Sequence, residues 1–288
     1  NLFKNLKPDL NLILGDRTDA LASSLAAYHM NIPNAHIHGG DKSKAGIDEY
    51  TRHAITKISN IHFAATKKSK ERIIKMGENP KFVFFTGSPS IDEIILNKIT
   101  TKNELEKKYN LKFSGQEILL LQHPVTTQTT KSKSQIKITL EGLSKSKKQI
   151  IGIFPNSDAG HDEIFLYLQK FAKVNSFIKI YSSIPRSDYL GLLKNCGILI
   201  GNSSSGIIEA SYFKIPVINL GIRQEGRETD PSVINIKNPT PNLINIQIQK
   251  LLNNKKHIKK VNVYGTGNSS KKIVQILKKI KLDEKLIQ

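Results

Sequence analysis

Titratable side chains crowd into one short stretch of the chain, between positions 36 and 53. Asp48 and Arg52 are four residues apart, so on a helix they would share one face. A carboxylate beside an arginine, close to the Gly39-Gly40 loop, could move a proton or bind an anion. A surface ion pair with no function has the same spacing, so the spacing alone does not decide between the two interpretations. The histidines, carboxylates and arginine of the stretch are His36, His38, Asp41, Asp48, Glu49, Arg52 and His53.

The three histidines of this stretch raise the question of a metal site. The spacing of His36, His38 and His53 fits no zinc template, and no cysteine accompanies them. The single cysteine, Cys196, lies in an apolar context typical of a buried, inert thiol, and it excludes an intramolecular disulfide. We therefore expect neither a metal nor another cofactor, and a reducing compartment.

A glycine- and serine-rich segment, Gly201 to Gly206, follows a short apolar run and precedes a predicted helix. Backbone N–H groups and hydroxyls in such a loop can hold a diphosphate. The alternative is a plain N-cap, in which one serine hydroxyl accepts a hydrogen bond from the helix backbone. The segment lacks the Gly-Lys-Ser/Thr ending of a P-loop. Arg223, shortly after the next apolar run, could pair with a phosphate or remain solvated.

Short apolar runs alternate with helical stretches along the chain, which predicts an α/β fold with parallel sheets. Ligands of open α/β sheets bind beyond the carboxyl ends of the strands, so polar residues just after the strands should line one cleft. The expected strands are residues 10–14, 35–38, 61–65, 82–85, 118–122, 150–154, 177–181, 198–200 and 217–220. Expected helices include residues 18–30, 48–58, 69–76 and 269–281.

The length of 288 residues favours about two domains. The polar stretch 97–110 is the best candidate boundary, because the strand pattern restarts after it. We expect a first domain at residues 1–108, a second domain at 109–265 and a terminal helix within 266–288. The chain has no initial methionine and soon enters a strand, so we expect the first domain to be incomplete.

The formal net charge of +20 can indicate nucleic-acid or membrane binding. The lysines are dispersed, however, and no aromatic residues interleave with them, so we expect no nucleic-acid partner. Compositional bias or attraction of a small anion accounts for the charge. No apolar run approaches the ~20 residues that span a bilayer, and no leader-like segment opens the chain. We expect a cytoplasmic protein without membrane contact.

Several of these segments together resemble the hydrolysing UDP-N-acetylglucosamine 2-epimerases. The resemblance covers nearly the whole chain in order, and Ile-Asp-Glu followed by Arg-His-Ala-Ile-Thr-Lys is a specific part of it. The matching segments are Gly15-Asp16-Arg17, His36 to Asp41, Ile47-Asp48-Glu49, Arg52 to Lys57, Gly201 to Gly206 and Pro216 to Arg227.

The resemblance implies two Rossmann-like, doubly wound domains of the GT-B type with the active site between them. It implies that the domain at residues 109–265 binds the nucleotide and that the terminal helix within 266–288 packs back toward the first domain. It implies anti-elimination of UDP from a UDP-sugar to a glycal, followed by hydration to the free 2-epimer. The usual product, N-acetylmannosamine, feeds sialic acid synthesis, and related enzymes act on diacetamido-trideoxy sugars toward legionaminic acid. The resemblance also implies a homo-oligomer.

Residue by residue, the resemblance assigns catalytic roles to four positions. Asp16 and Asp48 fall at the catalytic carboxylates of the family, and Arg52 at its arginine. His38 stands where the family often has a glutamate, and a histidine can also move protons near neutral pH. The implied substrate-binding residues are Arg17, His123 near the phosphates, Asn156, Ser203 and Ser204 at the diphosphate, Glu209 at the ribose hydroxyls and Arg223 on the nucleotide side.

Alternatives to a hydrolysing epimerase stay open. A non-hydrolysing epimerase usually has Glu-Ala-Gly where this chain has His38-Gly39-Gly40, which speaks against it. A GT-B glycosyltransferase would use the same nucleotide platform. A sugar-nucleotide binding protein without turnover is favoured by the exchange at His38 and by the missing Gly-Thr-Arg opening of the family.

Overall fold

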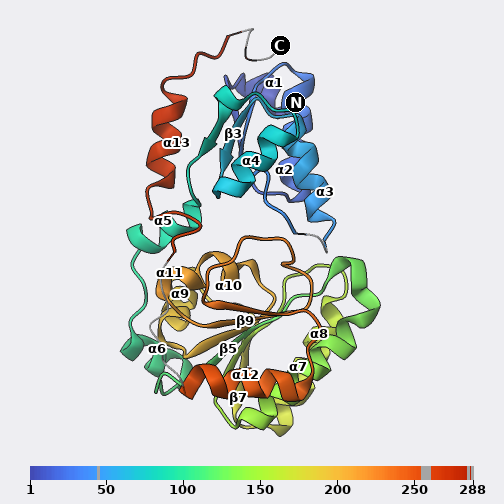
Figure 1. The fold of residues 1–288 in the computed structure, drawn as a ribbon, viewed down its shortest axis with the longest axis vertical. Coiled ribbons are helices and arrows are strands. Elements are labelled where there is room, and N and C mark those ends of the chain that lie inside the picture. Colours follow the sequence, from blue (N-terminus) through green and yellow to red (C-terminus); the bar gives the residue numbers. More distant parts are fainter. Residues whose placement is uncertain (44–45, 254–260, 284–285, 287–288) are drawn as a thin grey trace.

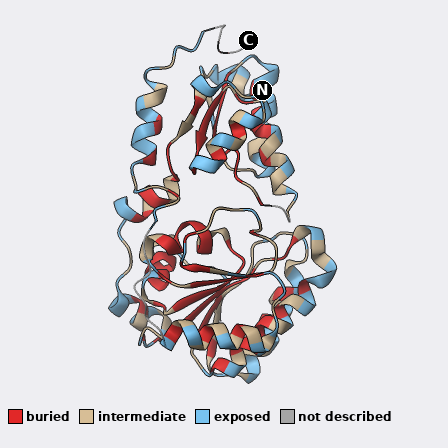
Figure 2. Ribbon diagram, in the orientation of Figure 1, coloured by how far each residue is buried: buried red, intermediate tan, exposed pale blue. Residues whose placement is uncertain are grey.

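The computed structural model describes residues 1–43, 46–253, 261–283 and 286. Two parallel sheets form separate domains, one above the other in Figure 1. Their strands are short runs rich in Ile, Val and Leu, and several are buried along their whole length, as expected of parallel strands covered on both faces. Figure 2 shows this burial as red strands in the middle of both domains. No helix within the described ranges is both long and apolar enough to cross a membrane.

The first domain holds a four-stranded sheet in the order β1-β2-β3-β4. Its strands are β1 (Asn11–Leu14), β2 (Asn34–Ile37), β3 (Ile61–Ala64) and β4 (Val83–Phe85). The helices that accompany it are α1 (Leu2–Leu6), α2 (Thr18–His29), α3 (Asp48–Lys57), α4 (Lys67–Lys75) and α5 (Pro89–Leu96), with a 3₁₀ turn, η1, at Pro80–Phe82.

The second domain holds a six-stranded sheet in the order β10-β9-β8-β5-β6-β7. Because the order reverses around β5, the crevice beyond β5, β6 and β8 is the expected ligand position of such a sheet. The strands are β5 (Ile118–Leu121), β6 (Ile150–Ile153), β7 (Ile178–Tyr181), β8 (Ile198–Gly201), β9 (Val217–Leu220) and β10 (Val233–Ile236).

Helices cover both faces of this second sheet. One apolar cluster joins the sheet to α7, α8 and α12, and the other joins it to α6, α9, α10 and α11. Their bounds are α6 (Lys102–Tyr109), α7 (Ser132–Ser146), α8 (His161–Val174), α9 (Arg186–Asn195), α10 (Ser204–Ile208), α11 (Ala210–Phe213) and α12 (Pro241–Asn253), with a 3₁₀ segment, η2, at Thr126–Lys131.

The last helix, α13 (Ser269–Leu277), returns to the first domain and lies beside its sheet in Figure 1. The backbone N–H groups of Ser269 and Ser270 donate to the Asp92 carboxylate of α5, at 2.9 and 2.6 Å. Ile273 belongs to the same apolar cluster as Phe63 and other residues of β2 and β3. The chain therefore crosses between the domains twice.

The fold class expected from the sequence is confirmed, because all strand pairs are parallel and alternate with helices. Two details differ from expectation. The strand β10 was not expected, and the polar stretch 97–110 contains the helix α6. The boundary expected between residues 108 and 109 falls at the end of α6, whose Leu105 packs in the core of the second domain.

Candidate active site

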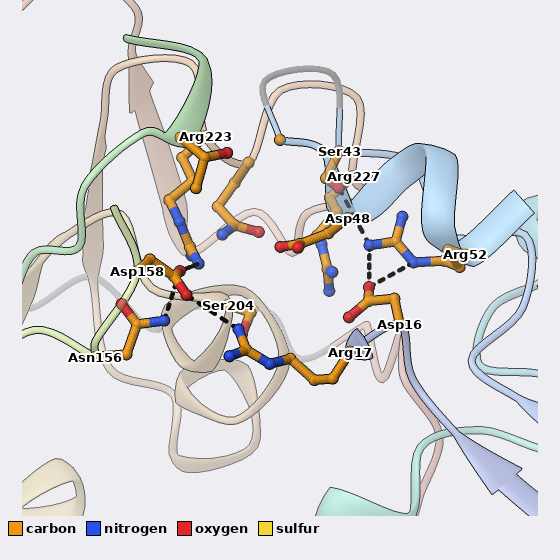
Figure 3. A pocket seen from close by; sticks show the side chains of 13 residues that line it. Asp16, Arg17, Ser43, Asp48, Arg52, Asn156, Asp158, Ser204, Arg223 and Arg227 are labelled. Atoms are coloured by element: carbon orange, nitrogen blue, oxygen red, sulfur yellow. Dashed lines mark hydrogen bonds and ion pairs between the residues drawn. The ribbon is translucent and has the colours of Figure 1, made fainter. Parts of the chain in front are cut away.

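A cavity of about 230 Å³ lies between the two domains, lined by residues that follow β1, β6 and β9 and by residues of α3 and α10. Its walls are strongly polar and carry carboxylates and guanidinium groups from both sides (Figure 3). The first domain contributes Asp16, Arg17, Ser43, Gly46, Asp48 and Arg52. The second domain contributes Thr126, Asn156, Asp158, Ser204, Arg223, Gln224 and Arg227.

Arg52, on α3, is buried and ties the wall of the first domain together. Its Nε and Nη2 both donate to Oδ2 of Asp16, the Nε bond being 2.8 Å long. The remaining donors reach the carbonyl oxygen of Asp41 at 2.8 Å and the hydroxyl of Ser43 at 3.2 Å. Asp16 follows β1 directly, so this pair joins the β1–α2 loop to the helix that carries Asp48.

Asp48 begins α3 and points into the pocket (Figure 3). Among the described residues it makes no hydrogen bond or ion pair. Burial, followed by the negative charge of Asp16, raises the pKa of the Asp48 carboxyl, while Arg223 and Arg52 oppose that rise. A half-buried carboxyl with a raised pKa and no partner among the described residues is suited to accept and return a proton.

Asp158 lies on the opposite wall, in the loop that follows β6. Its carboxylate accepts from Arg17 of the first domain at 3.0 Å and from the Asn156 amide at 2.6 Å, and Arg223 lies 3.8 Å away. Burial raises the pKa of Asp158, but the hydrogen bonds from Arg17 and Asn156 outweigh it and hold the pKa below its usual range. The Asp158 carboxylate therefore lies beside guanidinium groups from both domains at the pocket (Figure 3).

His123 follows β5 and stands behind Asn156 rather than among the lining residues. The Asn202 amide fixes its backbone, accepting from the His123 N–H at 2.7 Å and donating to its carbonyl at 2.9 Å. The ring Nδ1 accepts from the Asn156 backbone N–H at 3.2 Å. Burial, with help from Arg223, lowers the pKa of His123 to about 4, so the ring is neutral near pH 7.

His38 does not line this pocket. Its backbone is left-handed, with φ of 67°, and its ring spans 3.2 Å to Oδ2 of Asp41 and 2.9 Å to the hydroxyl of Ser88. Asp41 is buried, accepts from the Ser69 hydroxyl at 2.8 Å and lies 3.6 Å from Arg227 of the second domain. In this arrangement both ring nitrogens of His38 serve contacts inside the protein.

The serine-rich loop is divided between two tasks. Ser204 lines the pocket, whereas the Ser203 hydroxyl caps α10 by accepting from the backbone N–H of Ser205 at 3.3 Å. Glu209, at the end of α10, is buried and paired with Arg186, whose Nη1 lies 3.1 Å from Oε2. Arg186 also pairs with Glu93 of α5, so Glu209 belongs to a contact between the domains and is not a lining residue.

The structure thus gathers seven of the eleven predicted site residues around one cavity: Asp16, Arg17, Asp48, Arg52, Asn156, Ser204 and Arg223. His38, His123, Ser203 and Glu209 lie outside its lining. Asp158 was not singled out, although it stands two residues beyond Asn156 in a loop that the strand-end rule already pointed to. No cluster of metal-ligating side chains is found in the part of the chain that the structure describes.

Comparison with solved structures confirms the GT-B-type architecture. The UDP-N-acetylglucosamine 2-epimerase from Neisseria meningitidis bound to UDP-N-acetylglucosamine superposes with a TM-score of 0.83 at 23% sequence identity, covering 97% of this chain and 78% of that one. The Methanocaldococcus jannaschii enzyme in complex with UDP-N-acetylglucosamine and UDP gives 0.80 at 24%, covering 96% and 77%. These likenesses concern the fold.

Two relatives found by sequence have a higher percentage identity to this chain than these solved structures. A UDP-N,N'-diacetylbacillosamine 2-epimerase (hydrolyzing) from Legionella pneumophila is 37% identical over 99% of this chain and 75% of its own length. Polysialic acid biosynthesis protein P7 from Escherichia coli is 39% identical over 82% of this chain and 60% of its own length. The chain thus spans between 60% and 75% of these two relatives. Residues 1–278 match the family described as UDP-N-acetylglucosamine 2-epimerase, and the chain belongs to that family.

Proposed function

We propose that this protein is a hydrolysing 2-epimerase of a UDP-linked N-acetylated sugar. The observation that carries the proposal is that the Asp16 and Asp48 carboxylates line the same cleft as arginines from both domains. Two nearby carboxylates in different surroundings suit a reaction in which one proton is removed and another is returned. The cationic groups suit the departure of a diphosphate.

The reaction runs in two stages. In the first, a carboxylate takes the proton from C2 of the sugar, the C2–H electron pair forms a C1=C2 double bond, and the C1–O bond breaks as UDP leaves with its electrons. In the second, water adds to the glycal, its hydroxyl going to C1 and a proton to C2 on the face opposite to the original hydrogen. The products are UDP and the free 2-epimeric sugar.

Different lining residues suit proton transfer and binding of the diphosphate. Asp48 is the stronger candidate for proton transfer, because it has a raised pKa and no partner among the described residues. Asp16 accepts a hydrogen bond from Arg52 and can act as a fixed negative charge or as the second proton-transfer group. Arg17, Arg223 and Ser204 offer donors to the diphosphate. Displacing Asp158 from Arg17 would free that guanidinium for the phosphates.

The hydrolysing outcome is supported by relatives whose names state it. The L. pneumophila relative is a hydrolysing UDP-N,N'-diacetylbacillosamine 2-epimerase, and a Campylobacter jejuni relative, 35% identical over 81% of this chain, is a GDP/UDP-N,N'-diacetylbacillosamine 2-epimerase (hydrolyzing). We therefore favour the diacetamido sugar over UDP-N-acetylglucosamine as substrate. Its product would serve the synthesis of legionaminic acid, and that of the alternative substrate the synthesis of sialic acid. Assembly into a homo-oligomer stays a prediction.

The decisive experiment offers the protein each substrate and follows the products by NMR. Free UDP together with a free manno-configured sugar is the expected result. An intact UDP-manno sugar would instead identify a non-hydrolysing epimerase. Retained UDP binding without any turnover would identify a binding protein, and transfer of the sugar to an acceptor would identify a glycosyltransferase.

A substitution tests the role of Asp48. We expect Asp48→Asn to lower turnover by at least ~100-fold, as removal of an acid–base group does, with little change in UDP affinity. Asp162→Asn is the matched control, because the Asp162 side chain is 83% exposed on α8, away from the pocket, and its loss should leave turnover unchanged. Wild-type turnover in Asp48→Asn would remove this residue from the mechanism.

A further inference from the structure

His36 is a buried histidine, fully enclosed on β2, that the proposed reaction does not use. Its Nε2 lies 2.8 Å from the carbonyl oxygen of Gly15, and its Nδ1 lies 3.2 Å from the hydroxyl of Thr56. Gly15 directly follows β1, and Thr56 belongs to α3. The ring therefore links two segments that are separate in the sequence.

Each of these two segments carries a pocket carboxylate. Gly15 immediately precedes Asp16, and α3 begins with Asp48. The Thr56 hydroxyl also lies 2.8 Å from the carbonyl oxygen of Arg52, whose guanidinium holds Asp16. The His36 ring is thus a second cross-link between the Asp16 loop and α3, beneath the Arg52 pair.

A third segment, the Gly39-Gly40 loop, packs against the His36 ring. A Cβ atom built on Gly39 would lie 2.9 Å from Nδ1 of His36 and 3.1 Å from the Thr56 hydroxyl oxygen. Real Cβ atoms rarely approach so closely, so a side chain at position 39 would displace the ring. The Gly39-Gly40 loop is therefore fitted to His36, and the glycine is explained by this contact.

The protonation state of His36 suits a fixed link. Burial lowers the pKa of His36 to about 4, despite the hydrogen bond to Gly15, so the ring is neutral at physiological pH. Because a carbonyl only accepts, the proton sits on Nε2 and donates to Gly15. Nδ1 then carries no proton, and the Thr56 hydroxyl shares its single proton between Nδ1, at 3.2 Å, and the Arg52 carbonyl oxygen, at 2.8 Å. A neutral ring used on both sides is poorly suited to acid–base work and well suited to positioning.

We propose that His36 is a positioning residue that sets the separation of the Asp16 and Asp48 carboxylates by tying the loop after β1 to α3. The proposal rests on the proposed function for its kinetic consequences. Small displacements of reacting groups are costly, since a misplacement of about 1 Å can lower turnover on the order of 100-fold. Loss of the link should therefore lower kcat more than it raises KM.

The link also has a consequence for proton transfer. The negative charge of Asp16 helps to raise the pKa of Asp48, so an Asp16 loop that moves away from α3 should let the pKa of Asp48 fall. The acid limb of the kcat profile would then move to lower pH. Among the described residues, the other charged groups that face Asp48 across the pocket come from the first domain and from the loops after β6 and β9: Arg17, Arg52, Asp158, Arg223 and Arg227.

The test compares His36→Leu with His62→Leu. His62 is the register partner of His36 on β3 and is equally buried, but its ring contacts Glu78, outside the pocket lining, at 3.4 Å. We expect His36→Leu to lower kcat about 10- to 100-fold with KM changed less than about threefold, and to shift the acid limb downward. His62→Leu should keep both. His36→Gln, which can still donate to Gly15, should recover much of kcat.

One further measurement and one further variant complete the test. The pKa of Asp48, followed by carboxyl-carbon NMR, should fall in His36→Leu and not in His62→Leu, whether or not the protein turns over a substrate. If wild-type protein shows no turnover, the proposed function fails, while this NMR comparison still tests the link. If His36→Leu does not fold, Thr56→Val replaces it; this change removes the hydroxyl that contacts Nδ1 and also donates to the Arg52 carbonyl oxygen. An unchanged profile and an unchanged Asp48 pKa, or equal losses in both histidine variants, would overturn the proposal.

Discussion

Two arginines of the pocket pair with aspartates but differ sharply in burial, and this difference predicts different costs of removal. The Arg52 side chain is 2% exposed and the Arg17 side chain is 60% exposed. Arg52 holds Asp16 with two donors and has two further acceptors within the first domain. Arg17 makes one 3.0 Å bond to Asp158 across the domain interface.

The magnitudes follow from these surroundings. Removing one partner of a buried ion pair costs about 3–5 kcal/mol of unfolding free energy, because the remaining charge is left without compensation. The Asp16 side chain is 21% exposed, so water relieves part of that penalty, and we expect a loss of about 3 kcal/mol for Arg52→Met. An exposed pair contributes about 1 kcal/mol or less, so Arg17→Met should change stability little. It should instead weaken UDP binding.

Urea denaturation of both variants at pH 7 measures the two free energies. A double-mutant cycle of Arg52→Met with Asp16→Asn then isolates the pair, and its coupling energy should be at least about 1 kcal/mol for residues in direct contact. Equal stability losses in Arg52→Met and Arg17→Met would refute the argument from burial. A coupling energy near zero would show that Arg52 stabilises the domain without help from Asp16.

Three further predictions concern single residues. The kcat/KM profile should have an acid limb above the pH at which an ordinary aspartate titrates, because Asp48 must be ionised to take a proton and its pKa is raised; a limb near pH 4, the usual value, contradicts the assignment. Gly40→Ala should lower the thermal midpoint, with a loss of about 1–3 kcal/mol, because φ is +72° and the new Cβ would lie 2.5 Å from the Ser69 carbonyl; an unchanged midpoint excludes this strain. Cys196 should resist thiol reagents until denaturant is added, since burial raises its pKa, and rapid labelling of the native protein would contradict its enclosure.

The alternation of apolar runs and helical stretches was sufficient to predict the fold class. Buried parallel strands consist of near-continuous Ile, Val and Leu, and this local pattern survives without knowledge of the partners. The helix α6 was hidden in a polar stretch, although Thr101 and Glu104 form a capping box that marks its start. β10 (Val233–Ile236) was missed although its residue pattern matches that of β9; it differs in burial, because only its two ends are buried.

For the candidate site, the sequence by itself determined which polar residues follow strands, and so which could reach the cleft. Asp16, Asn156 and Arg223 were found in this way, because the carboxyl ends of parallel strands meet at one edge. Contacts between domains were beyond that rule. Arg17 and Asp158 are 141 positions apart, and Glu209 is turned toward Arg186 and α5. Only the tertiary structure decided these pairs, because their partners are set by how two separately folded sheets face each other.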